Sequence, residues 1–139
     1  MNAYFDDMIL SASPVELVRL LFQHAISKVR EARVHLREHR VGERAAAINS
    51  AYQVVGELMN SIDSGAAPDL AQRLRALYCY VLERLVEANL NQIDAPLSDV
   101  LGVLSTIAEA WSDLARPKPN PWATAGVAAD ESTSLVLTA

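Results

Sequence analysis

The sequence predicts an all-α protein, an antiparallel up-down-up-down four-helix bundle with an N-terminal arm and a disordered or loosely packed C-terminal tail. Apolar residues recur at helical spacing in four segments, each about 20–26 residues long. Short turns separate these segments, so neighbouring helices are expected to run antiparallel. The chain of 139 residues has the length of one domain. We therefore expect a bundle domain over 1–116, including an arm at 1–12, and a flexible tail at 117–139.

The first helix is expected at 14–39. A capping box marks its start, since Ser13 can accept from the third helical amide, Pro14 suits the first helical position and Glu16 can reach back to the cap. Gly42 is the predicted stop signal. The expected contribution of this helix to the core is one stripe at helical spacing: Val18, Leu21, Phe22, Ala25, Val29, Ala32 and Leu36.

The other three helices are expected at 43–62, 68–91 and 95–115. A turn rich in Gly, Pro and Asp precedes the second of these, and Pro96 lies in the first turn of the third. The proline-rich stretch 116–121 ends the last helix. The core stripe of 43–62 is Ile48, Tyr52, Val55, Met59 and Ile62, and that of 95–115 is Leu97, Val100, Leu101, Leu104, Ile107, Trp111 and Leu114.

The helix at 68–91 has apolar residues on two faces. Its predicted core stripe is Leu70, Leu74, Leu77, Val81, Leu85 and Ala88. Leu82, Val86 and Leu90 point roughly the opposite way, and Val54 lies off the stripe of the preceding helix. An exposed apolar patch usually marks an interaction site, so we expect a groove that accepts an amphipathic helix of a partner. The alternative is that the arm, the tail or the second copy in a homodimer covers this face.

The arm carries apolar residues just before the first helix, among them Tyr4, Ile9 and Leu10, while two aspartates give it a polar side. We predict that the arm is a replaceable lid, because a cover that leaves when a partner binds is a two-state device. A permanently packed terminal extension is the alternative. The apolar end of the tail, at 132–139, is a further candidate to occupy the groove.

Composition and motifs give no support to catalysis or cofactor binding. The sequence has no glycine-rich phosphate loop or acid–base constellation, and only His35 and His39, spaced i, i+4, suggest metal ligands. The single cysteine, Cys79, excludes an internal disulfide. No signal peptide is recognised, and no apolar run approaches the roughly 20 residues of a membrane span. We therefore expect a cytoplasmic protein with no catalytic residues, metal, cofactor or membrane insertion.

Charge is distributed unevenly along the chain. The net charge of −5 argues against non-specific nucleic-acid binding. Seven basic residues nevertheless lie between positions 19 and 44, namely Arg19, Lys28, Arg30, Arg33, Arg37, Arg40 and Arg44. They leave open a second function, a generic helical adaptor or scaffold that engages an acidic partner or nucleic acid. Because no aromatic residue lies among the arginines from 30 to 44 to stack on bases, we expect no nucleic-acid partner.

Four features of the sequence occur in the order found in one known family. They are "YFDDMILSASPVELVRLLFQHAI" at 4–26, "ELMNSID" at 57–63, "LRALYCYVLERLVEANL" at 74–90, and Trp111. Together they resemble the FliS-type family of flagellin export chaperones over about 4–115. The stretch "LFQHA" departs from the family pattern, which usually has a tyrosine followed by aspartate there.

The resemblance implies a non-enzymatic chaperone in the cytoplasm of a flagellated bacterium. Its expected partner is the C-terminal segment of flagellin, which is disordered before filament assembly and is wrapped as helices on the chaperone. Binding would prevent premature polymerisation and aid delivery to the flagellar type III export apparatus. The family also has an N-terminal arm that covers part of the apolar surface and is displaced.

Overall fold

The computed structural model describes residues 13–115 apart from 64 and 66. The predicted arm at 1–12 and tail at 117–139 lie outside these residues, so the lid residues Tyr4, Ile9 and Leu10 are not placed. The described chain forms four helices, α2 (Pro14–Arg37), α3 (Val41–Asn60), α4 (Pro68–Asn91) and α5 (Ala95–Ala115). This arrangement confirms the predicted all-α four-helix bundle.

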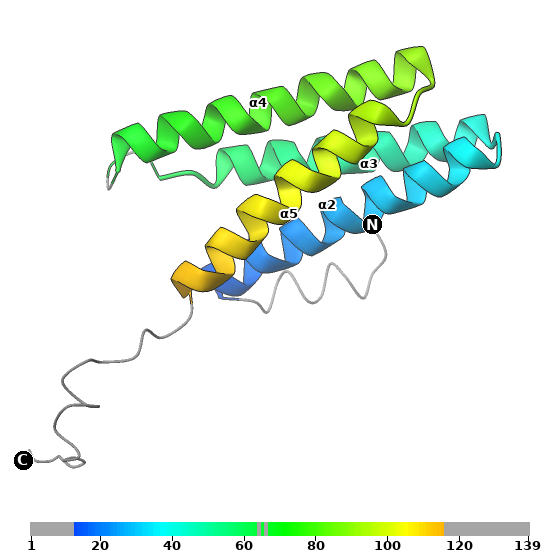
Figure 1. The fold of residues 1–139 in the computed structure, drawn as a ribbon. Coiled ribbons are helices and arrows are strands. Elements are labelled where there is room, and N and C mark those ends of the chain that lie inside the picture. The colour runs from blue at the N-terminus through cyan, green and yellow to red at the C-terminus, as the bar shows by residue number, and fades with distance from the viewer. Residues whose placement is uncertain (1–12, 64, 66, 116–139) are drawn as a thin grey trace, which may run out of the picture.

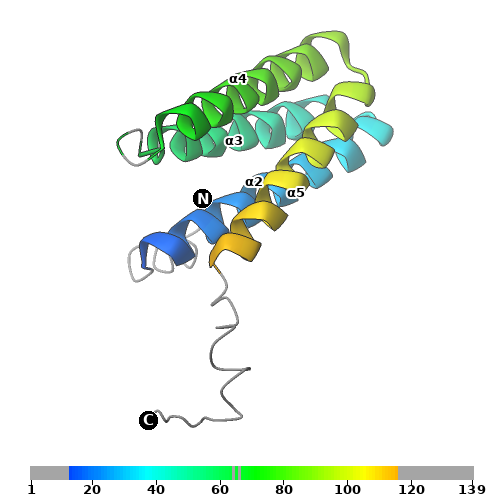
Figure 2. The ribbon, with the colours of Figure 1, turned by 60° about the vertical axis from the view of Figure 1, so that its left-hand side comes forward.

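The four helices form an antiparallel bundle that is wider at one end (Figure 1). Each helix packs against the next along the chain, and α5 closes the bundle by packing against α2. α4 lies along α3, whereas α5 runs diagonally from the α4–α5 turn toward the start of α2 (Figure 1). α4 and α5 therefore meet at their connecting turn and diverge toward the other end, as Figure 2 also shows.

The start of α2 is fixed by a side-chain cap. The Oγ of Ser13 accepts a hydrogen bond from the backbone N–H of Glu16 at 3.2 Å, and Pro14 occupies the first helical position. The carboxylate of Glu16 accepts hydrogen bonds from the guanidinium of Arg19, with a distance of 3.0 Å from Nε to Oε2. The serine half of the predicted capping box is thus formed, while the glutamate pairs along the helix surface.

The end of α2 differs from the prediction. The helix ends at Arg37, and His39 turns the chain with a φ of 58°. Gly42, the predicted stop signal, lies instead within the first turn of α3. Histidine tolerates the left-handed region better than most side chains, so this turn does not need a glycine.

The core lies along the shared axis of the four helices. Its fully or almost fully buried residues include Phe22, Ala25, Val29 and Ala32 of α2, Ile48, Ala51, Val55 and Leu58 of α3, Val81, Leu85 and Ala88 of α4, and Leu97, Val100 and Leu104 of α5. Several of these are alanines, whose small side chains let helices pack closely.

Three residues predicted for the core are exposed instead. They are Tyr52 of α3 and Leu70 and Leu77 of α4, whereas Ala71 and Tyr78 are buried. Moving by one position turns an α-helix by 100°, so the N-terminal half of α4 presents a different stripe from the predicted one. The physical reason is that α4 packs on α3 and α5, and α5 diverges from this half of the helix.

Two ion-pair clusters attach the start of α5 to its neighbours. Arg33 of α2 donates two hydrogen bonds to Asp94, at 2.8 and 2.9 Å, just before α5 begins. Asp99 of α5 accepts from the Tyr80 hydroxyl and from Nε of Arg84, the latter at 3.0 Å. Because of the Arg33 contact, the pKa of the Asp94 carboxyl is below its usual range.

Candidate partner-binding site

A shallow depression of about 230 Å³ lies between α3 and α4. Its lining residues, which define the α3/α4 groove, are Ile48, Asn49, Tyr52, Val86, Asn89 and Leu90. Val86 and Leu90 are 44% and 73% exposed, and Tyr52 of α3 is also exposed. Two of the four predicted groove residues therefore lie together on an open apolar surface, next to the ring of Tyr52, which is exposed although its stripe predicts a core position.

The other two predicted groove residues belong to the interior. Val54 is buried in the core, and Leu82 is partly buried and packs against it. Because α3 lies between α2 and α4, it buries a wide stripe that includes both Val54 and Val55. Leu82 follows the fully buried Val81 and lies at the edge of the α4 stripe. The assignment of Val54 and Leu82 to the groove is therefore wrong.

A second apolar cavity opens where α4 and α5 diverge. This α4/α5 wedge has a volume of about 370 Å³ and is lined by residues that include Phe22, Leu70, Leu74, Tyr78, Ile107 and Trp111. The rings of Phe22 and Tyr78 lie 6.5 Å apart, and burial raises the pKa of Tyr78 to about 12. Sequence reasoning missed this cavity, since it placed its lining residues in a closed core.

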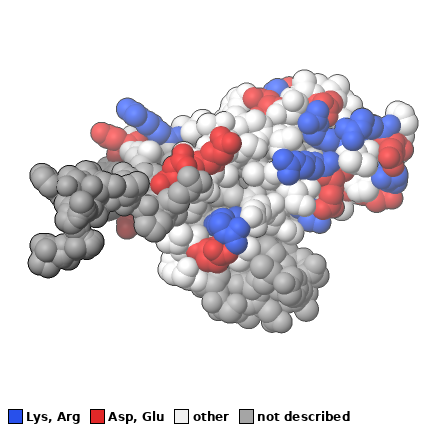
Figure 3. All heavy atoms as spheres, turned by 60° about the horizontal axis from the view of Figure 1, so that its bottom comes forward, with Lys and Arg blue, Asp and Glu red and all other residues white. Residues whose placement is uncertain are grey.

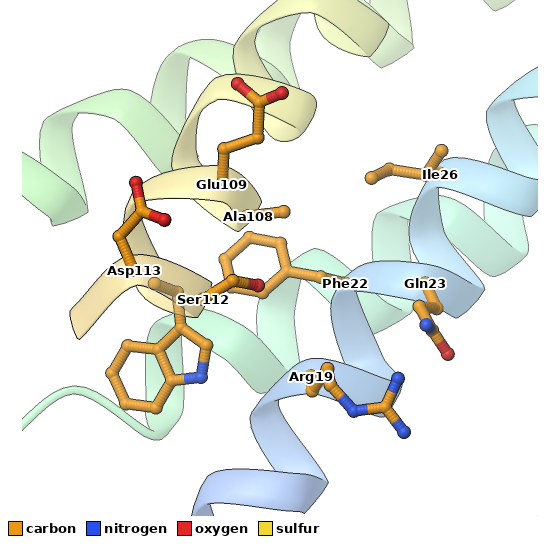
Figure 4. Close-up of a pocket in the computed structure, with 9 residues that line it drawn as sticks. Arg19, Phe22, Gln23, Ile26, Ala108, Glu109, Ser112 and Asp113 are labelled. Carbon is orange, nitrogen blue, oxygen red and sulfur yellow. The ribbon is translucent and has the colours of Figure 1, made fainter. Parts of the chain in front are cut away.

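A third cavity, of about 560 Å³, lies between α2 and α5 and is named the α2/α5 cleft. Figure 4 shows Phe22 and Ile26 of α2 facing Ala108 of α5, with the carboxylates of Glu109 and Asp113 on the α5 side. This cleft combines an apolar floor with acidic side chains on α5, while Arg19 lines it on the α2 side and is paired with Glu16. It thus differs in chemistry from the α3/α4 groove, whose lining residues carry no charge.

Leu20 is buried in an unexpected place. It lies about 200° around α2 from Phe22, at 100° per residue, and therefore on the face opposite the core. Its side chain is nevertheless only 4% exposed. Leu20 is also absent from the core cluster formed by the described residues. The outer face of α2 thus has a buried leucine that the bundle core does not account for.

The basic residues of α2 and α3 do not form an open basic strip. Four of them form ion pairs: Arg19–Glu16, Lys28–Glu31, Arg33–Asp94 and Arg40–Glu38. Arg44 is buried in the bundle. Figure 3 shows lysines and arginines at the end of the bundle with the α2–α3 turn, with acidic side chains among them. This mixture of charges does not favour a phosphate-binding surface.

Within the described ranges, no group of three or more His, Cys, Asp and Glu side chains could hold a metal ion. His35 has a local role, since its Nδ1 accepts a hydrogen bond from Nε of Arg40 at 2.9 Å. Burial, together with the positive charge of Lys28, lowers the pKa of His24. None of the helices in the described part of the chain is both long and apolar enough to span a membrane.

A helical bundle with apolar grooves and exposed aliphatic side chains is typical of proteins that bind other polypeptides. The chain matches the family described as flagellar protein FliS over residues 1–118, and it belongs to this family. It is 33% identical over 110 residues to the flagellar secretion chaperone FliS of Salmonella typhimurium, covering 78% of this chain and 82% of that protein. It is 30% identical over 103 residues to the flagellar secretion chaperone FliSB of Pseudomonas aeruginosa, covering 74% and 82%. The resemblance found in the sequence is confirmed.

Proposed function

We propose that the protein is a non-enzymatic export chaperone that binds the C-terminal segment of flagellin. Bound in this way, flagellin would be kept from polymerising prematurely and would be delivered to the flagellar export apparatus in the cytoplasm. Membership in the FliS family and the names of the relatives support the chaperone role. The observation that carries the choice of site is the exposed pair Val86 and Leu90 beside Tyr52.

The α3/α4 groove has the chemistry to hold an amphipathic helix. Leu90 and Val86 are spaced four positions apart on α4, so their side chains lie on one face, one turn apart. Burying an aliphatic side chain of this size contributes about 1.5–3 kcal/mol. The amide side chains of Asn49 and Asn89 can hydrogen-bond to polar groups at the edge of the guest helix. Binding through such a surface should depend only weakly on salt.

The arm is proposed as a lid that the guest displaces. Its residues Tyr4, Ile9 and Leu10 lie outside the described residues, but the buried Leu20 on the outer face of α2 supports a cover for that face. The arm joins α2 at Ser13, about 10 Å along the helix axis from Leu20 at 1.5 Å per residue. A segment of twelve residues can therefore reach it. A second copy of the chain is the alternative cover.

The adaptor function based on basic residues is less well supported. Among these basic residues, ion pairing and the burial of Arg44 leave Arg30 and Arg37 as exposed arginines, and each is followed in the chain by an exposed glutamate. A salt titration separates the two functions, since phosphate binding weakens steeply with salt and burial of an apolar helix does not.

The test is the binding of a synthetic flagellin C-terminal peptide to the full chain by isothermal titration calorimetry. Val86→Asp and Leu90→Asp should each weaken binding at least about tenfold, which corresponds to roughly 1.4 kcal/mol. Val41→Asp is the matched control, because Val41 is also an exposed valine but lies at the start of α3, outside the groove. Helicity and melting temperature should remain near wild type in all three variants.

Two outcomes would contradict different parts of the proposal. A wild-type chain that does not bind the peptide would overturn the flagellin-binding function. Equal affinity in the Val86→Asp variant and the Val41→Asp control would leave the function in place but move the site away from the α3/α4 groove. Unfolding of the Val86→Asp variant would show that Val86 contributes to the core.

A further inference from the structure

We propose that the α2/α5 cleft is the docking site for the chain's own segment 116–122, "RPKPNPW", which follows α5 directly. In this arrangement the segment folds back along α5 and places Trp122 between α2 and α5. The inference concerns a cleft other than the proposed flagellin groove and does not depend on flagellin binding. It also involves residues 119–122, which lie beyond the part of the chain that matches the FliS family.

The cleft has space and an apolar floor for an aromatic side chain. Its volume is about 560 Å³, and Phe22, Ile26 and Ala108 lie on its inner surface. Glu109 and Asp113 are exposed on α5 and bring negative charge to the edge. A cleft of this kind favours a ligand that combines an aromatic group with positive charge.

The segment after α5 has this combination. Arg116 and Lys118 supply two positive charges within three residues, and Trp122 supplies the aromatic ring. Prolines at every second position from 117 to 121 favour an extended polyproline conformation, so little conformational entropy is lost when the segment docks. Proline-rich segments of this type bind to aromatic-lined grooves in other proteins.

The indole of Trp111 offers a hydrogen-bond donor to a segment docked in this cleft. Trp111 lies between the α2/α5 cleft and the α4/α5 wedge and lines both, and its Nε1 is buried with no hydrogen-bond partner in the described chain. A buried donor without an acceptor is costly. Polyproline segments have unpaired backbone carbonyls, so a segment lying in the cleft can accept from Trp111.

The geometry allows the segment to reach the site. α5 ends at Ala115, and Ala108 lies about 10 Å back along the helix at 1.5 Å per residue. From Pro117 to Pro121 an extended polyproline chain spans about 12 Å at 3.1 Å per residue. A reversal at Arg116 would therefore bring Trp122 to the level of Ala108.

The test is the NMR signal of the Trp122 indole N–H in the full-length, isotope-labelled chain. In the wild type this signal should differ from that of the free peptide 116–125. Charge reversal by Glu109→Lys and Asp113→Lys should move the signal to the free-peptide position. The matched control is Glu57→Lys with Glu83→Lys, a double charge reversal at exposed positions of α3 and α4 that should leave the signal unchanged.

A second variant tests the same contact without altering the bundle. Trp122→Ala should shift the Trp111 indole signal and empty the cleft. The peptide 116–125 should then bind this variant at least about tenfold more tightly than the wild type, whose own segment competes at high effective concentration. A Trp122 signal at the free-peptide position in the wild type would overturn the proposal. The proposal would also be overturned if the bound-state signal disappeared when the protein was diluted roughly tenfold, because the segment would then lie in the cleft of a second copy.

Discussion

Replacing Arg44 with methionine should leave the bundle as stable as the wild type or slightly more stable, although this arginine is only 5% exposed. The guanidinium lies at the C-terminal end of α4. Its Nη2 is 3.5 Å from the carbonyl oxygen of Asn89 and 3.4 Å from Oδ1 of Asn89, and its Nη1 is 3.4 Å from Oε1 of Gln92, so all three hydrogen bonds are long. Nε has no partner, and Arg44 forms no ion pair with an acidic side chain among the described residues.

The expected size of the effect follows from three opposing contributions. Interaction of the positive charge with the α4 C-terminus stabilises by about 0.3–1 kcal/mol, and by up to roughly 2 kcal/mol when partly buried. Removing an ion from water costs several kcal/mol. Methionine keeps most of the apolar volume of the arginine side chain and removes this cost, so we expect a change within about 1 kcal/mol. Arg44→Ala also removes the packed stem, and the resulting cavity should destabilise the bundle by about 2–4 kcal/mol.

Urea denaturation followed by far-ultraviolet circular dichroism measures both effects. Arg30→Met is the control, because Arg30 is exposed on α2 and should change the free energy of unfolding by less than about 0.5 kcal/mol. If Arg44→Met destabilises the bundle as strongly as Arg44→Ala, the reasoning is refuted. The charge itself, through the end of α4, would then be the main contribution of this residue.

Three further predictions concern the core and two titrating groups. By urea denaturation, Leu85→Ala at a fully buried site should cost about 2–5 kcal/mol, whereas Val86→Ala, one position further and exposed, should cost less than about 1 kcal/mol. In an ultraviolet titration one tyrosine should ionise near pH 12, because burial raises the pKa of Tyr78 to about 12, and Tyr78→Phe should remove this step. The neutral Tyr78 side chain makes its full contribution to the free energy of unfolding below the usual tyrosine pKa near 10. This contribution is lost as pH rises toward 12, because the unfolded chain releases the proton first. Asp94→Asn should cost at most about 1 kcal/mol near neutral pH, since the pair with Arg33 is partly exposed. Because the folded pKa of Asp94 is lowered, the difference between variant and wild type should begin to shrink as pH falls below the unfolded pKa of about 4, and it should vanish only below the lower folded pKa.

The fold could be predicted because helix starts and stripes are local signals. Ser13 and Pro14 begin α2 by cap chemistry that the sequence displays directly. The end of α2 was less predictable, because His39 adopts the left-handed conformation and the nearby Gly42 does not. A stop signal in sequence specifies that a turn is near, but the residue that takes the positive φ depends on how α2 and α3 pack.

The orientation of α4 could not be predicted from its own periodicity. Leucine and valine occur on both of its flanks, so several stripes of similar hydrophobicity are available. The structure selects the one with Ala71 and Tyr78 in place of Leu70 and Leu77. This choice depends on the divergence of α5, which is a property of the assembled bundle (Figures 1 and 2). The same divergence creates the α4/α5 wedge, which for that reason has no signature in the sequence.

The predicted groove residues are exposed where they lie far from the buried stripe, and they are buried or partly buried where they lie near its edge. Val86 and Leu90 lie well away from the buried face of α4 and are exposed, whereas Leu82 is partly buried and packs against the core. Val54 is buried because α3 packs against both α2 and α4, and its buried stripe is wide enough to include both Val54 and Val55. The angle of a residue around its helix therefore identifies an exposed position only when it exceeds the width of the buried face, and that width is set by how the neighbouring helices pack in the assembled bundle.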